Sequence, residues 1–305
     1  MSTTLSTYEF FEKFPTDAAA RQYMEQRRWG GKPDACPLCG VVGRVQTRTR
    51  VGFFRCLDCR SDFTVRTGTV FERSHVPLNK WLYAMYLLVT ARKGVSSLQL
   101  SKEIGVTQKT AWFMLQRLRE AAGHNGDGLL GGIVEADEAY FGGRESNKHE
   151  SRKLRAGRGT VGKTAVLGVR ERGGETRAVV IPTASTRVIH EALAALVDPS
   201  AMLMTDEHAA YRGAPVAAHM SVNHTAKEFV DGMAHTNDIE SVWAVLKRGY
   251  YGVYHQFSVK HLQRYVDEFT YRLNEGNVHM STMQRIDALL GKAEGCRITY
   301  EGLTA

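Results

Sequence analysis

The sequence is poor in cysteine and proline and has no long apolar run. Its 305 residues include 5 cysteines and 7 prolines, and the longest apolar run covers residues 81–89. A run of this length is too short to cross a lipid bilayer. The N-terminal segment lacks a basic stretch followed by an apolar one, which is the pattern of a secretion signal. We therefore expect a soluble protein of a reducing, intracellular compartment, because a secreted disulfide scaffold would carry more cysteines.

Negative charge is scarce in the N-terminal part of the chain. The formal net charge is +8. Residues 1–132 hold 19 Lys or Arg and 11 Asp or Glu, whereas residues 133–305 hold 21 of each kind. The whole excess therefore lies before residue 133, as expected if this part binds a polyanion. Nucleic acid is favoured over an acidic membrane surface, because the sequence has no lysine-rich amphipathic helix with an aromatic face.

The hydrophobic pattern changes in character near residue 125. Before it, helices are predicted at residues 77–91, 96–104 and 107–122. The glycine-rich segment 125–128 is read as a linker. After it, the pattern predicts strands at 133–141, 164–170, 176–181, 201–205 and 221–224, and helices at 186–196, 238–251 and 259–275. The sequence therefore predicts a multidomain protein of mixed α+β and α/β class.

Four of the five cysteines form two C-x2-C pairs separated by sixteen residues. Tetrahedral zinc takes four soft ligands, and each pair offers two of them from one turn. The segment between the pairs is long enough for the hairpin of a zinc ribbon. Two disulfides or redox thiols are the alternatives. We predict one structural Zn²⁺ held by Cys36, Cys39, Cys56 and Cys59, and we assign no role to Cys296.

Residues 98–107 have the pattern of a helix-turn-helix unit. A first helix ends at Gly105, and Thr107 is placed to cap the next helix. In that second helix, apolar residues recur at helical spacing and the remaining side chains are polar or basic. A helical hairpin with a solvated basic face is the alternative. The polar candidates on the second helix are Gln108, Lys109, Gln116, Arg117 and Arg119. Of these we predict Gln108, Lys109 and Arg117 as DNA contacts.

Three acidic residues stand out by their surroundings. Asp137 lies inside a predicted strand, where an unpaired buried charge is costly. Asp206 directly follows a short apolar strand, and Glu240 lies near the start of a predicted helix. Carboxylates on such elements can converge and hold two hard divalent cations, the arrangement used for phosphoryl transfer. Lys247 lies seven residues after Glu240, on the same helix face, where it can contact a phosphate.

Each of these carboxylates also has an ordinary structural interpretation. Asp206 can form a turn, and Glu240 can be an acid favoured by the dipole at a helix N-terminus. Asp137 is flanked by Glu135, which alternation places on the same strand face, and by Glu138 on the other face. Either neighbour is an alternative ligand.

Residues 144–163 form a basic loop with few apolar residues. Seven of them are Lys or Arg and two are Glu. Such a loop can contact the phosphates of flanking or target DNA, and a solvated loop is the alternative. The candidate DNA contacts in this loop are Lys153, Arg155 and Arg158.

The order of these parts resembles one family. The chain combines a zinc ribbon and a helical DNA-binding unit with three sequence blocks: VEADEAYFGG at 134–143, TDEHAAY at 205–211 and a block that begins HTNDIESVW at 235. This combination is similar to the DDE transposases of bacterial insertion sequences, in the ISXO-like subfamily with an N-terminal zinc ribbon. The resemblance covers about residues 8–280. It implies a ribonuclease-H-like core whose metal-binding triad is Asp137, Asp206 and Glu240, with Lys247 as the basic residue. In this subfamily the third acidic position can be Asn, so Asn237 is an alternative to Glu240.

The resemblance also implies an activity and a division of the chain. We expect a transposase that binds terminal inverted repeats and target DNA, as a homodimer or larger assembly in the bacterial cytoplasm. It would cleave and join DNA with two Mg²⁺ or Mn²⁺ ions. A non-catalytic DNA-binding regulator and a hydrolytic nuclease are the alternatives. The predicted parts are a helical segment at 1–31, the zinc ribbon at 32–73, the helical DNA-binding unit at 74–124, the catalytic domain at 128–285 and a C-terminal tail at 286–305.

Overall fold

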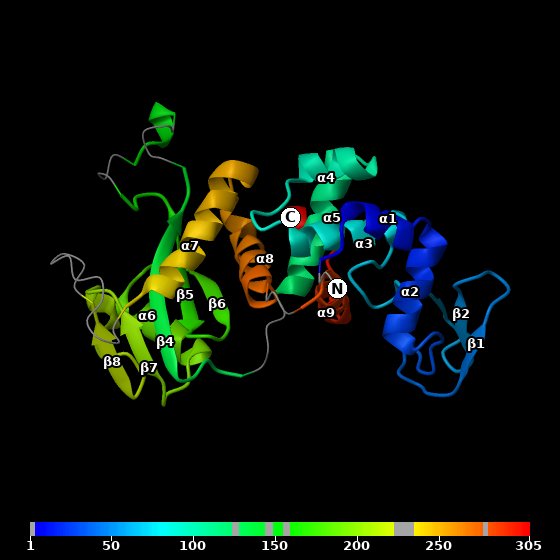
Figure 1. Ribbon diagram of the computed structural model, residues 1–305, viewed down its shortest axis with the longest axis horizontal. Coiled ribbons are helices and arrows are strands. Elements are labelled where there is room, and N and C mark those ends of the chain that lie inside the picture. The colour runs from blue at the N-terminus through cyan, green and yellow to red at the C-terminus, as the bar shows by residue number, and fades with distance from the viewer. Residues whose placement is uncertain (1–3, 124–127, 144–148, 155–158, 223–234, 277–279) are drawn as a thin grey trace. The chain divides into compact units, whose positions relative to one another are not determined.

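The structure is a computed structural model that describes residues 4–123, 128–143, 149–154, 159–222, 235–276 and 280–305. The chain forms two compact units. One consists of residues 1–124 with 275–305, and the other of residues 125–274 (Figure 1). Among the described residues, no helix combines the length and the hydropathy needed to span a membrane.

The first unit begins with two helices and a small antiparallel sheet. These elements are α1 (Thr7–Lys13), α2 (Asp17–Trp29), β1 (Val45–Thr47), β2 (Phe54–Cys56) and β3 (Asp62–Phe63), with β2 as the middle strand. Trp29 packs edge-on against Phe54 and Phe63, with ring centroids 5.4 and 6.1 Å away. Because strands this short cannot bury a core alone, the aromatic contact fixes the sheet to α2.

Three further helices follow the sheet in the first unit. They are α3 (Leu78–Thr90), α4 (Ser97–Ile104) and α5 (Gln108–Ala122). Gly105 ends α4 in the left-handed conformation with φ of 62°, and the Thr107 hydroxyl caps α5 by accepting the N–H of Thr110. Gln116 and Arg119 of α5 are buried. Helix α5 is therefore largely a core helix, and its exposed part is the first turn.

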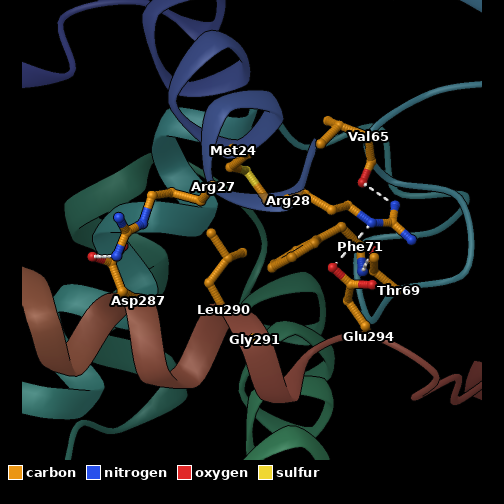
Figure 2. Close-up of a pocket in the computed structure, with 10 residues that line it drawn as sticks. All are labelled: Met24, Arg27, Arg28, Val65, Thr69, Phe71, Asp287, Leu290, Gly291 and Glu294. Carbon is orange, nitrogen blue, oxygen red and sulfur yellow. Dashed lines mark hydrogen bonds and ion pairs between the residues drawn. The ribbon is translucent and has the colours of Figure 1, made fainter. Parts of the chain in front are cut away.

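The C-terminal segment belongs to the first unit and contains α9 (Thr282–Lys292) and α10 (Tyr300–Thr304). Asp287 of α9 pairs with Arg27 and accepts a hydrogen bond from the Tyr23 hydroxyl. The Arg28 Nε atom lies 3.2 Å from the Glu294 carboxylate. Figure 2 shows the Arg27–Asp287 and Arg28–Glu294 pairs at the lining of a cavity. The volume of this cavity is about 150 Å³. The sequence pattern assigned residues beyond 285 to a tail, whereas ion pairs with α2 integrate them into the first unit.

The second unit is built on a mixed five-stranded sheet (Figure 1). Its strands are β4 (Ile133–Phe141), β5 (Thr164–Glu171), β6 (Thr176–Ile181), β7 (Met202–Thr205) and β8 (Ala218–Ser221). The order is β6-β5-β4-β7-β8, where β4, β5 and β6 are antiparallel neighbours and β4, β7 and β8 are parallel. The sequence predicted the last strand at 221–224, whereas β8 begins at Ala218 and ends at Ser221. Residues 223 and 224 lie outside the described residues.

Different helices cover the two faces of this sheet. They are α6 (Thr186–Leu196), α7 (Asn237–Gly249), which continues into a π-helical turn (Tyr250–Tyr254), and α8 (Leu262–Asn274). Ala136 of β4 packs in the core under α6, whereas Ala139 packs in the core under α7 and α8. Because side chains alternate along a strand, Glu135 and Asp137 lie on the α7 face and Glu138 on the α6 face.

Candidate metal centres and nucleic-acid interface

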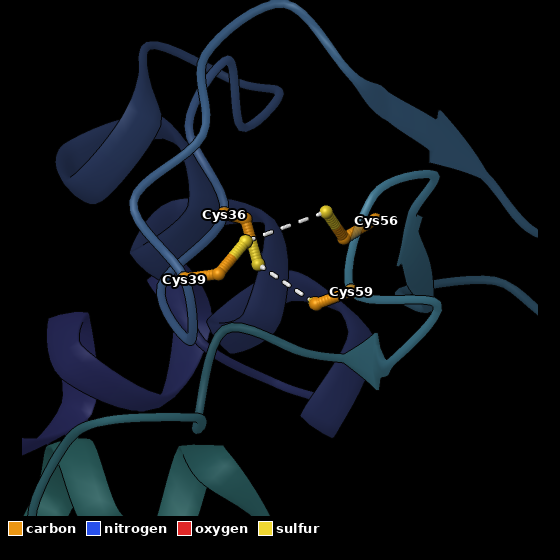
Figure 3. A group of neighbouring side chains, drawn as sticks. All are labelled: Cys36, Cys39, Cys56 and Cys59. Carbon is orange, nitrogen blue, oxygen red and sulfur yellow. Dashed lines mark hydrogen bonds between the residues drawn. The ribbon is translucent and has the colours of Figure 1, made fainter.

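The four cysteines of the C-x2-C pairs converge in the first unit (Figure 3). Their sulfur atoms all lie within 4.8 Å of one another. The Sγ atoms of Cys36 and Cys59 are 3.8 Å apart, and those of Cys39 and Cys56 are 3.7 Å apart. Four Zn–S bonds of about 2.3 Å at tetrahedral angles put the sulfurs about 3.8 Å apart. The donor set and its spacing therefore fit a structural zinc ion.

The surroundings shift the pKa values of the thiols in opposite directions. A backbone hydrogen bond from Val41 lowers the pKa of Cys39, but desolvation and the three neighbouring thiols outweigh it and raise this pKa to about 12. The backbone N–H and hydroxyl of Ser61 lower the pKa of Cys59 to about 6, which favours the thiolate that zinc binds. Cys296 is buried elsewhere in the first unit, and its thiol donates to the Lys292 carbonyl at 3.2 Å. The fifth cysteine is therefore not part of the cluster.

Asp137 lies in the middle of β4, opposite Gly168 of β5. Its Oδ1 atom accepts the N–H of Glu138 at 2.8 Å. Burial raises the pKa of Asp137 to about 6, the carboxylates of Asp206 and Glu240 raise it as well, and Lys247 acts in the opposite direction. The second unit thus brings Asp137 into electrostatic contact with the other three residues that the sequence singled out.

The register of two parallel strands explains why Asp206 lies near Asp137. Ile133 pairs with Met202 and Glu135 with Met204, so the same register carried two residues further sets Asp206 level with Asp137. An Oδ1 atom of Asp206 accepts the N–H of His208 at 2.9 Å, which makes the turn considered in the sequence analysis. The turn uses only the Oδ1 atom of Asp206. It is therefore compatible with a role of the other Asp206 oxygen beside Asp137.

Glu240 and Lys247 reach this region from α7, which packs closely against the sheet. A Cβ atom on Gly168 would lie 2.5 Å from Cζ2 of Trp243, so a glycine is needed where the indole ring contacts the strand. Glu240 and Lys247 are exposed on α7, and Glu240 accepts a hydrogen bond of 3.0 Å from the Thr236 hydroxyl. The need for glycine at position 168 is not visible in the sequence, because it depends on a ring 75 residues later in the chain.

The two alternative ligands on β4 have different surroundings. Glu135 is fully buried and lies 2.8 Å from Arg172 Nε, so its oxygens are already engaged. Glu138 lies on the other sheet face, 3.4 Å from Nδ1 of His208. Burial raises the pKa of Glu138 to about 7, and the Asp137 and Asp206 carboxylates raise it as well. Of the three β4 carboxylates, Asp137 is therefore the one that both lies on the α7 face and is close to the negative charges of Asp206 and Glu240.

The carboxylates fit hard divalent cations by their chemistry. Mg²⁺ and Mn²⁺ take oxygen ligands, and Asp137 lies in a field of like charge that a cation would neutralise. In the described part of the chain, the cysteine cluster is the one group of three or more ligand atoms gathered within 4.8 Å. The three carboxylates are therefore not gathered as closely as the four thiols.

Comparison with known proteins gives the family. The ISXO2-like transposase domain matches residues 129–274, and the transposase zinc-ribbon domain matches residues 15–62. An "Uncharacterized protein in transposable element ISH50" from Halobacterium salinarum is 33% identical over 253 residues, which cover 77% of this chain and 83% of the relative. The chain belongs to the ISXO2-like transposase family. The relative is archaeal, so it does not show the bacterial origin expected from the sequence.

Two solved structures also resemble this ISXO2-like chain weakly. They are the Mos1 strand transfer complex and a pre-cleavage Mos1 transpososome, each 12% identical with a TM-score of 0.26. They cover 70% of this chain and 78% and 79% of the respective Mos1 chains. A likeness this weak does not establish a shared fold.

The predicted contacts on α5 of this family member separate into surface and interior residues. Gln108 and Lys109 are exposed in the first turn. Gln108 Nε2 donates to Ser97 Oγ at 2.8 Å, and Lys109 Nζ lies 4.4 Å from the ring centre of Tyr300. Arg117 is only 7% exposed. Its guanidinium donates to the carbonyls of Val70 and Glu72 at 2.8 and 3.0 Å, so Arg117 holds a loop in the interior and we remove it from the proposed DNA contacts.

The remaining predicted residues are placed as follows. Lys153 Nζ lies 2.8 Å from the Glu150 carboxylate in the basic loop. Arg155 and Arg158 lie outside the described residues. Asn237 is the exposed first residue of α7, and its carbonyl accepts a hydrogen bond of 2.9 Å from the Ser241 hydroxyl. The amide side chain of Asn237 is therefore still an alternative to Glu240.

Proposed function

We propose that this family member is a DNA transposase that binds the terminal inverted repeats of its element, cleaves there and joins the freed ends to target DNA. The observation that carries the proposal is the electrostatic coupling of Asp137 with Asp206, Glu240 and Lys247, four residues from three separate elements. Membership in the family supports the same activity.

The proposed catalytic core is ribonuclease-H-like. Strand order supports it, because the first strand of the second unit lies at the centre, flanked by the antiparallel second strand and the parallel fourth strand. In this arrangement the parallel neighbour β7 ends beside the middle of the central strand β4, and the late helix α7 packs on the same face. Asp137, Asp206 and Glu240 are placed on these three elements.

The proposed chemistry follows from the oxygen ligands. When bound, two Mg²⁺ or Mn²⁺ ions would activate a water, then a 3′-hydroxyl, and stabilise the leaving oxygen of the phosphodiester. Asp137 and Asp206 would hold these ions and Glu240 would complete the ligand set from α7. Lys247, two turns along the same helix, would contact a phosphate of the DNA.

The first unit is proposed to bind DNA. Its zinc site has four thiolate ligands and no open position, so it supports the fold and takes no part in catalysis. Gln108 and Lys109 are the proposed contacts on α5. In the second unit, Lys153, Arg155 and Arg158 of the basic loop are proposed to contact phosphates of flanking or target DNA. Because two ends must be joined, we propose that at least two copies assemble on DNA.

A strand-transfer assay tests this function. The purified chain, Mg²⁺ and a labelled duplex carrying the end of the element would be compared with Glu240→Ala and Asn237→Ala. We expect joined product from the unmodified chain and from Asn237→Ala, and none from Glu240→Ala. Cleavage without joining would favour the nuclease, and DNA binding without either reaction would favour the regulator.

A further inference from the structure

The second unit holds a fully buried carboxylate, Glu135, on β4 two residues before Asp137. A buried carboxylate is costly unless charges and hydrogen bonds compensate it. Arg172 Nε donates to Glu135 Oε1 at 2.8 Å. His235 Nδ1 lies 3.1 Å from the same oxygen. The Arg172 guanidinium thus holds the first carboxylate oxygen, and the His235 ring lies beside it.

The second oxygen of Glu135 lies at the start of α7. It accepts the backbone N–H groups of Asp238 and Ile239 at 2.9 and 3.2 Å. Amides in the first turn of a helix have no partner within the helix, and residues that precede a helix usually supply one. The preceding residue here is Thr236, whose hydroxyl makes no such cap and instead donates to Glu240. Glu135 therefore caps α7 from another element.

Arg172 ties the same segment to the sheet a second time. Its Nη2 atom donates to the carbonyl of His235 at 3.0 Å, and its backbone N–H donates to the Ile133 carbonyl at 3.0 Å. Glu135 and Arg172 thus join the end of β5, the strand β4 and the residues that lead into α7. A carboxylate at the positive end of a helix is also favoured by the helix dipole.

We propose that Glu135 is a positioning residue that fixes the start of α7 on β4 and so brings Glu240 within reach of the metal ions held with Asp137. The inference rests on the proposed function, because it presumes that Glu240 is a ligand. Asp137 and Glu135 share one strand face, and Glu240 lies in the turn of α7 that Glu135 caps. Any shift of the helix start changes the distance between the Glu240 and Asp137 carboxylates.

Mn²⁺ binding to the zinc-loaded chain, measured by calorimetry without DNA, tests the proposal apart from activity. Glu135→Gln removes the charge and keeps the size of the side chain. We expect Mn²⁺ affinity to fall about 10- to 100-fold, the loss typical of residues that orient metal ligands. Asp238→Asn is the matched control, because Asp238 lies in the first turn of the same helix and forms a half-exposed pair with Arg170 at 3.8 Å. The Mn²⁺ affinity of Asp238→Asn should stay within about twofold of that of the unmodified chain.

A double-mutant cycle shows whether Glu135 acts through Glu240. In a Glu240→Ala background, Glu135→Gln should cause no further loss of Mn²⁺ affinity. Wild-type affinity in Glu135→Gln, or an equal further loss in the Glu240→Ala background, would overturn the inference. If the unmodified chain and Asp137→Asn bind Mn²⁺ alike, the proposed function itself fails and this inference with it.

Hydrogen exchange of the unmodified chain keeps the proposal testable if Glu135→Gln does not fold. Amide protons in a first helical turn exchange quickly unless a partner protects them. We expect those of Asp238 and Ile239 to be protected more than about tenfold over the Gln284 amide at the corresponding place in α9, whose cap is the exposed Ser281 side chain. Equal exchange at the two helix starts would overturn the inference.

Discussion

The two ligand sets of this chain are assembled in opposite ways. The four cysteines come from two short turns, and their sulfur atoms lie at the spacing that zinc requires. The carboxylates of Asp137, Asp206 and Glu240 come from β4, the end of β7 and α7, and burial together with their like charges raises the pKa of Asp137. One set is fixed by local sequence and the other by tertiary packing of a strand against a helix.

The difference shows what each site needs from the rest of the fold. A C-x2-C pair brings its own geometry, so the ribbon requires little beyond an aromatic anchor such as Trp29. The acidic site needs residues that are not ligands. Gly168 admits the Trp243 ring to the sheet, and Glu135 holds the start of α7. We therefore expect ribbon variants to fail by losing zinc, and variants near the carboxylates to fail by losing alignment.

The largest expected effect concerns the zinc site. Cys56 is fully buried in β2, and Cys56→Ser removes one of the four thiolates. Because apparent zinc-binding energies of such sites are about 10–16 kcal/mol, we expect loss of zinc and unfolding of residues 33–66. Zinc content by mass spectrometry and hydrogen exchange by segment would measure both. Strands β4 to β7 should keep their protection.

Cys296→Ser is the matched control for this prediction. It removes a buried thiol of the same unit whose bond is to the Lys292 carbonyl. We expect full zinc content and unchanged exchange in residues 33–66. If the amides of residues 33–66 stay protected from exchange in Cys56→Ser without zinc, the fold of the ribbon does not depend on the metal. The expectation that ribbon variants fail by losing zinc would then be wrong.

The second prediction concerns Asp137→Asn. The folded pKa of Asp137 is about 6 and its ordinary value is 3.8, so the folded state binds this proton more tightly and loses stability as pH rises from about 4 to 6. We expect Asp137→Asn to stabilise the protein without Mg²⁺ by about 1–3 kcal/mol at pH 7.5 and by little at pH 4. Thermal melting at the two pH values measures this.

The same substitution should abolish the metal chemistry. Mn²⁺ affinity should fall at least about 100-fold in Asp137→Asn, and in the unmodified chain it should weaken as pH falls below 6, because the ligand must lose its proton. DNA binding by the first unit should persist. Destabilisation of Asp137→Asn at pH 7.5 would mean that the carboxylate is a structural partner rather than part of a repulsive cluster.

The contrast between the sites also explains what could be predicted from the sequence. The zinc ligands follow from spacing, and strand β4 and helix α6 were predicted with the boundaries that the structure has. Glu135 was weighed as a ligand, because alternation along β4 shows its face and not its partners. Arg117 was assigned to DNA, because helical periodicity does not reveal that Val70 and Glu72 carbonyls surround its guanidinium.

The third prediction tests the packing that aligns α7. Gly168→Ala puts a methyl group 2.5 Å from the Trp243 ring, which must then move away from the sheet. Overpacking of this kind costs about 1–3 kcal/mol, and we expect Mn²⁺ affinity to fall with it. Calorimetry and thermal melting measure the two effects. Gly131→Ala is the control, because a methyl group there has open space around it.

The smallest expected effect concerns DNA contacts in the first unit. Lys109 is exposed in the first turn of α5, beside the Tyr300 ring. Lys109→Ala should weaken binding of element-end DNA a few fold and reduce the slope of log affinity against log salt by about 1, because one phosphate contact is lost. Lys13→Ala removes the same charge from an exposed site on α1 and should leave the slope unchanged. Mn²⁺ affinity should be unaffected in both variants, since neither residue belongs to the second unit. If both variants change the slope equally, the first unit attracts DNA by its net charge, and α5 is not a specific contact.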